Sequence, residues 1–122
     1  MRLKTIGRFT PYWDVWLIAA VLAGVNLPLL FGAGTGRYAL IPSAVGSGEW
    51  WRLVTHPFAH ITWYHLLLDG LPFFLIYPFL DEKKPFRRLV YVVASAAGAG
   101  WAGWAVPAVA ESGFRGLSGV TY

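Results

Sequence analysis

The sequence has no cysteine and only one methionine, and charged residues make up just 13% of its 122 positions. Without cysteine, the protein cannot be a disulfide scaffold, bind zinc through thiolates or use thiol catalysis. The scarcity of charge, a hydrophobic fraction of 57% and a mean hydropathy of +0.51 exclude a disordered chain and disfavour a water-soluble domain. One domain is expected at this length. The composition therefore predicts a single-domain protein whose natural solvent is lipid.

The predicted fold is all-α and polytopic, with three membrane-spanning helices at about residues 12–31, 62–80 and 89–110 and a fourth that starts near residue 118. The first stretch has 20 residues, which span about 30 Å as a helix, the thickness of the apolar core of a bilayer. Glycine and proline residues between the first two stretches oppose a continuous helix there. Residues 32–56 are therefore predicted to form a long outer loop.

Lysine and arginine are concentrated on one side of the predicted helices. Seven of them precede the first helix or separate the second from the third: Arg2, Lys4, Arg8, Lys83, Lys84, Arg87 and Arg88. Three lie elsewhere: Arg37, Arg52 and Arg115. Because short basic connections stay in the cytoplasm, we predict a cytoplasmic N-terminus and an outward-facing loop. This asymmetry and contact with anionic headgroups explain the net charge of +4, so nucleic-acid binding is not predicted.

Ionisable side chains stand near the outer end of the second predicted helix. His65 lies about one turn and Asp69 about two turns into this helix, where an ionisable group costs roughly 2.5–3.5 kcal/mol on insertion scales. Such groups usually mark a functional site. Because they are four residues apart, both side chains project onto one face of the helix. We therefore expect them to act together at the outer leaflet.

A glycine-rich turn follows the third predicted helix. Gly116 and Gly119 bracket Ser118, which allows a ligand to approach the backbone closely. If a fourth helix begins at Ser118, its free N–H groups would stabilise negative charge that forms beside the serine. Ser118 is also a suitable helix N-cap, which is the purely structural interpretation. The predicted topology places Ser118 at the same outer face as His65 and Asp69.

Between Gly48 and Tyr122 the sequence resembles the rhomboid family of intramembrane serine proteases. Four motifs carry the resemblance in order: Trp51-Arg52, His60 and His65 with aromatic residues between them, the turn Asp81 to Lys84, and Gly116-Leu117-Ser118-Gly119 with Tyr122 behind it. Each motif alone is weakly specific, whereas their order and spacing together are specific. The resemblance implies a helical membrane protease that cuts transmembrane proteins near the outer face of the lipid bilayer, without a cofactor or a metal.

The resemblance also implies a role for each matched position. Ser118 would be the nucleophile that attacks a peptide carbonyl, and His65 would donate to the oxyanion together with the Ser118 N–H. The supporting positions are His60, Gly116, Gly119, Tyr122, Trp51 and Arg52.

Two departures from the family pattern bear on activity. The family has asparagine where this chain has Asp69, and a carboxylate accepts hydrogen bonds but cannot donate one. Ionised, Asp69 would repel an oxyanion; we expect it either to be protonated or to hold His65 as an imidazolium. The second departure is that the family's general base is a histidine on a later helix, which this chain does not contain. We therefore expect an incomplete, N-terminal part of a rhomboid-like protease, inactive by itself.

Other interpretations of the same residues remain open. The first apolar stretch with its preceding basic residues also fits a signal peptide, although it is longer than the roughly 7–15 apolar residues typical of one. A metal site would use these side chains: His56, His60, His65 and Asp69. The chain could also be a pseudoprotease that binds membrane helices without cutting them, or a small structural membrane subunit. The sequence predicts no oligomeric state.

Overall fold

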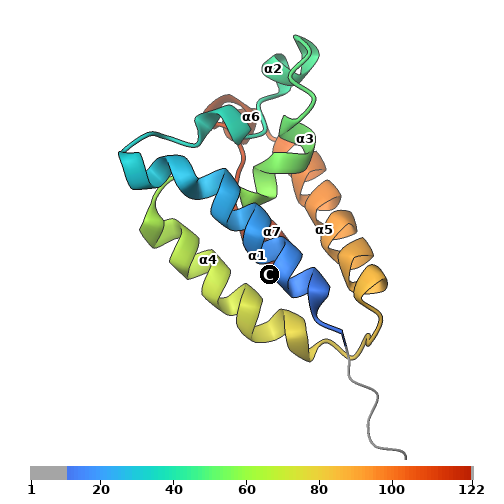
Figure 1. Cartoon of the computed structure of the whole chain (residues 1–122). Coiled ribbons are helices and arrows are strands. Elements are labelled where there is room, and N and C mark those ends of the chain that lie inside the picture. The colour runs from blue at the N-terminus through green and yellow to red at the C-terminus, as the bar shows by residue number, and fades with distance from the viewer. Residues whose placement is uncertain (1–10, 122) are drawn as a thin grey trace, which may run out of the picture.

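The computed structural model describes residues 11–121, which form an all-α fold without a strand in that range. Three long helices, α1 (Trp13–Asn26), α4 (Trp63–Ile76) and α5 (Pro85–Ala105), form the body of the molecule (Figure 1). The short elements are η1 (Leu27–Phe31), η2 (Gly36–Tyr38), α2 (Pro42–Gly46), α3 (Arg52–Thr55), η3 (His56–Phe58), η4 (Tyr77–Phe79), α6 (Pro107–Ser112) and α7 (Ser118–Thr121).

The core lies where the long helices meet α7. Its fully buried apolar side chains are Ile18, Leu22, Phe73, Tyr77, Val92 and Leu117. Ile18 and Leu22 stand four residues apart and therefore share one face of α1. On α4 and η4, the rings of Phe73 and Tyr77 stack with centroids 4.9 Å apart. This packing places α7, which begins at Ser118, against α4 and α5.

The outward faces of the long helices are strongly apolar. Several large side chains are each more than 60% exposed: Trp16, Phe31, Leu67, Phe79 and Trp101. Buried positions, by contrast, include Asp14, Asn26, Asp69 and Arg88. Apolar residues outside and hydrogen-bonded polar residues inside are typical of helices surrounded by lipid.

By length and hydropathy, one helix within residues 11–121 qualifies as a membrane span: Trp13–Phe31, with 19 residues and a mean hydropathy of 1.9. It corresponds to the first predicted span. The other two spans remain predictions from the sequence. α5 has 21 residues, and every stretch of it that is long enough to cross a membrane contains the charged residue Arg88.

The third helix is displaced from its predicted position at 89–110. It begins at Pro85, because proline suits the first helical position, where its missing N–H leaves no bond unmade. It ends at Ala105, because Pro107 disfavours helical geometry at the preceding residue, and Val106 is extended with φ −103° and ψ 107°. The segment after this break forms the separate helix α6.

A buried ion pair joins the first and third long helices. Arg88 donates from Nη2 to Asp14 Oδ1 at 2.7 Å and from Nε to Asp14 Oδ2 at 2.8 Å, and the Tyr77 hydroxyl donates to the same Oδ2 at 2.8 Å. The start of α1 therefore lies at the same end of the molecule as the α4–α5 connection, opposite α2, α3 and α6 (Figure 1). The orientation of these two ends in a membrane stays a prediction.

Candidate functional site

Ser118 follows a backbone turn that only glycine adopts easily. Gly116 has φ +111°, which side chains disfavour. A Cβ atom at Gly116 would also lie 2.8 Å from Asp69 Oδ2 and 3.2 Å from His65 Nε2. The absence of a side chain at Gly116 therefore lets the chain pass directly against the polar face of α4.

Asp69 lies at the centre of the polar cluster. Its Oδ2 accepts a hydrogen bond from the Ser118 N–H at 3.3 Å and lies 3.1 Å from His65 Nε2 and 3.6 Å from His60 Nε2. Asp69 is only 6% exposed. The structure thus brings together the serine, both histidines and the aspartate that the sequence singled out. One N–H that donates to a buried oxygen atom, together with an imidazole nitrogen at ion-pair distance from it, forms a site for an oxygen that carries negative charge.

The hydrogen bonds of the two histidine rings assign their tautomers. Nδ1 of His65 accepts from the Ile61 N–H at 3.4 Å, so its Nε2 carries the proton that faces Asp69. His60 has the opposite arrangement, because its Nδ1 donates to Phe58 O at 3.0 Å and its Nε2 accepts from the Leu117 N–H at 3.4 Å. Burial lowers the pKa of His60 and His65 nearby lowers it further, which favours the neutral ring.

Sequence reasoning missed the residues that position His60. Asn26 at the end of α1 accepts from the His60 N–H at 2.9 Å through Oδ1 and donates to Phe58 O at 2.7 Å through Nδ2. Thr35 donates from its hydroxyl to the His60 carbonyl oxygen. The side chains of Asn26, Thr35 and His60 are fully buried. The available signal was an amide side chain at the end of an otherwise apolar stretch, where unpaired polar groups are costly.

The loop that leads to Ser118 is fixed by the segment between α1 and α4. Leu40 and Phe114 exchange two backbone hydrogen bonds of 2.8 and 3.0 Å, and the Gly116 N–H donates to His56 O at 3.0 Å. The rings of His56 and Phe114 lie 5.7 Å apart. Residues 113–117 are therefore bound to the segment between α1 and α4 at two points immediately before the serine.

Trp51 and Arg52 form hydrogen bonds within the segment between α1 and α4. Arg52 donates through Nη1 to the carbonyl oxygens of Gly36 and Ala39, both at 2.8 Å, and pairs through Nη2 with Glu49 at 2.6 Å. Trp51 donates from Nε1 to Arg37 O at 3.1 Å. These contacts cross-link the beginning and the end of the loop segment 36–52.

The remaining residues that the sequence singled out make no recorded contact with the Asp69 cluster or lie outside the described residues. Gly119 lies in α7, whereas Tyr122 and the basic residues Arg2, Lys4 and Arg8 lie outside the described residues. His56 is directed away from the cluster, and its Nε2 is buried without a hydrogen-bond partner. Within the described part of the chain, no three histidine or acidic side chains are arranged to hold a metal ion.

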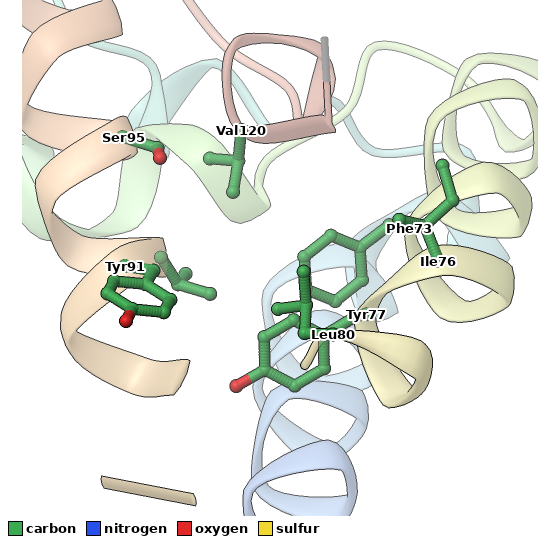
Figure 2. A pocket seen from close by; sticks show the side chains of 8 residues that line it. Phe73, Ile76, Tyr77, Leu80, Tyr91, Ser95 and Val120 are labelled. Carbon is green, nitrogen blue, oxygen red and sulfur yellow. The ribbon is translucent and has the colours of Figure 1, made fainter. Parts of the chain in front are cut away.

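An apolar cavity of about 170 Å³ lies beside α7, apart from the polar cluster. Its lining comes from α4, η4 and α5, and Figure 2 shows Val120 of α7 directed into it. Tyr91 and Ser95 of α5 line the wall that faces α4 and η4 (Figure 2). No member of the Asp69 cluster lines this cavity. The cavity therefore offers mainly apolar surface and is separate from the polar cluster around Ser118.

Comparison with known families identifies the segment that holds this cluster. The family model described as Rhomboid domain matches residues 47–122. The matched segment includes His60, His65, Asp69 and Ser118 and leaves out α1. Searches of curated proteins and of solved structures find no significant match.

Proposed function

This chain belongs to the rhomboid family, and we propose that it carries the nucleophile and the oxyanion donors of a serine endopeptidase that cleaves transmembrane proteins near the outer face of the membrane. Members of this family are membrane-embedded and are generally intramembrane serine proteases. The observation that carries the proposal is the convergence of the Ser118 N–H and His65 Nε2 on one point beside the serine.

In the proposed reaction, Ser118 Oγ forms a bond to the carbonyl carbon of a peptide, and the electron pair of the C=O double bond moves to oxygen. The resulting oxyanion accepts hydrogen bonds from the Ser118 N–H and from His65 Nε2. Each donor of this kind contributes roughly 10²–10³ in rate in serine proteases. When the tetrahedral intermediate collapses, the amide nitrogen leaves with a proton and the acyl group stays on Ser118.

The reaction also requires a base that removes the proton from Ser118 Oγ. Within residues 11–121, no side chain forms a hydrogen bond with this hydroxyl. The nitrogens that face the cluster are already engaged, because His60 Nε2 accepts from Leu117 and His65 Nε2 faces Asp69. We therefore expect the chain to be inactive unless a base from outside these residues is supplied.

Cleavage in liposomes tests the proposal. The chain is reconstituted with a single-span substrate protein, with and without imidazole as a diffusible base, and the products are identified by mass spectrometry. We expect a cut near the outer end of the substrate helix only when imidazole is present. Ser118→Ala abolishes this product, whereas the control Ser95→Ala, in the apolar cavity, preserves it. A product that persists in Ser118→Ala would refute the proposal.

A second candidate function is the binding of membrane helices without cleavage, as in a pseudoprotease. The observation that favours it is Asp69, whose carboxylate engages the donors that a substrate carbonyl would need. In the same liposome experiment, this candidate predicts that the substrate co-purifies with the chain and stays intact at every imidazole concentration.

A further inference from the structure

We propose that the Asp69 carboxylate occupies the oxyanion position of the resting site, so that a substrate carbonyl oxygen binds only by displacing it. The inference rests on the proposed function, because it concerns the same two donors. It assigns Asp69 the role of an internal competitor for the site, in place of a donor to the oxyanion.

A single oxygen atom of Asp69 engages both donors. Its Oδ2 lies 3.3 Å from the Ser118 nitrogen and 3.1 Å from His65 Nε2. Each of these nitrogens carries one proton in the assigned tautomers, and each N–H makes one well-directed hydrogen bond. The Ser118 N–H is therefore not free for a second acceptor while this contact persists, and His65 Nε2 lies against the same carboxylate oxygen. A carbonyl oxygen held by the same donors has to lie where Oδ2 lies.

The space around Oδ2 excludes a second oxygen beside it. The backbone of Gly116 passes so close that a Cβ atom there would lie 2.8 Å from Oδ2. His60 Nε2 lies 3.6 Å from Oδ2, and the carboxylate is 6% exposed. Simultaneous binding of Asp69 and a substrate oxygen at these donors would require one of these neighbours to move.

The charge on Asp69 has no basic partner other than histidine among residues 11–121. Asp14, the other buried aspartate, pairs with the Arg88 guanidinium, whereas the ion-pair distances of Asp69 are to His60 and His65 alone. A buried carboxylate is costly unless hydrogen bonds compensate its charge. The Ser118 N–H and His65 supply that compensation, so the site holds Asp69 as it would hold an anionic ligand.

Two measurements on the intact chain in detergent micelles test this inference. The first is the NMR shift of the Ser118 amide proton, which should move upfield in Asp69→Asn and Asp69→Ala because a charge-assisted hydrogen bond is lost. The second is the affinity for phenylboronic acid, which adds to a serine hydroxyl and presents an anionic oxygen. We expect it to rise at least about tenfold in both variants, because the donors become free. Asp81→Asn, which neutralises an exposed carboxylate in the α4–α5 connection, is the matched control and should change neither.

The outcomes separate this inference from the proposed function. An unchanged Ser118 amide in the isosteric Asp69→Asn variant would overturn the inference, even if Asp69→Ala fails to fold. Equal boronic acid affinity in all variants would also overturn it, while supporting a reactive Ser118. If the amide moves in both variants but no variant binds the boronic acid, the occupied site stands and the proposed serine chemistry fails.

Discussion

Gly103 of α5 and Phe114 of the serine-bearing loop lie so close that a Cβ atom on Gly103 would stand 2.8 Å from Phe114 Cγ. Gly100, one turn earlier, is similarly close to His56, with 3.1 Å from its Cβ position to the imidazole ring. The two glycines form recesses in α5 for the two aromatic rings that adjoin the Ser118 loop. The position of Ser118 therefore depends on small residues in a different helix.

Gly103→Ala should displace Phe114 and with it the loop before Ser118. Adding a methyl group to a filled interior typically costs about 1–3 kcal/mol, measurable as a lower unfolding temperature in micelles. The NMR amide signals of Gly116 and Ser118 should shift as well. Gly98→Ala is the matched control in the same helix, because nothing lies within 4 Å of its Cβ position. Equal stability and unchanged loop signals in both variants would contradict the claim that Gly103 makes room for the Phe114 ring.

Removal of one partner of the Asp14–Arg88 pair should destabilise the fold more than removal of both. Neither side chain is exposed, so Arg88→Leu leaves a buried carboxylate unpaired at a cost of about 3–5 kcal/mol. The double variant with Asp14→Leu should recover much of this loss. A double-mutant cycle in micelles measures the coupling. Additive effects of the two substitutions would show that the contact is energetically irrelevant.

Asn26→Ala should loosen the segment that holds His60. The substitution leaves the His60 N–H buried without a partner, at a cost of about 1–3 kcal/mol, and removes one of the two hydrogen bonds that the Phe58 carbonyl accepts. Hydrogen exchange at the His60 amide should accelerate accordingly. Asn26→Asp retains the acceptor for this amide and should exchange more slowly than Asn26→Ala. Ser47→Ala removes an exposed side-chain hydrogen bond and should leave His60 exchange at the wild-type rate.

Mild acidification should destabilise the folded chain through two histidines. Burial lowers the pKa of His56 and of His60 below the ordinary value, so both rings stay neutral when folded and gain protons on unfolding. The unfolded state therefore binds more protons below about pH 6.5, and stability falls as the pH drops from there towards the folded-state pKa values. Unfolding temperatures from about pH 7.5 to 5.5 test this. His56→Gln should reduce the slope, and an unchanged slope would contradict the role of His56.

The sequence allowed local relationships to be predicted better than distant ones. The four-residue spacing of His65 and Asp69 fixes their common helix face, and the glycines around Ser118 indicate a turn. The ends of α5 were predicted less well, because the prolines Pro85 and Pro107 set them and the prediction placed the helix at 89–110. The contact between Asn26 and His60 spans 34 positions, and that between Asp14 and Arg88 spans 74. Such pairs depend on how the helices pack against each other, and the spacing of residues along a single sequence does not reveal this packing. The contact of Asp69 Oδ2 with the Ser118 N–H, across 49 positions, depends on packing in the same way, and the role of Asp69 toward an oxyanion stays a prediction.

The most direct test of the central claim is the mass of the chain after treatment with an alkyl fluorophosphonate in the presence of imidazole. We expect one adduct, located on Ser118 by fragmentation, absent from Ser118→Ala and retained in Ser95→Ala. No adduct on the wild-type chain, or the same adduct on Ser118→Ala, would contradict the assignment of Ser118 as the nucleophile.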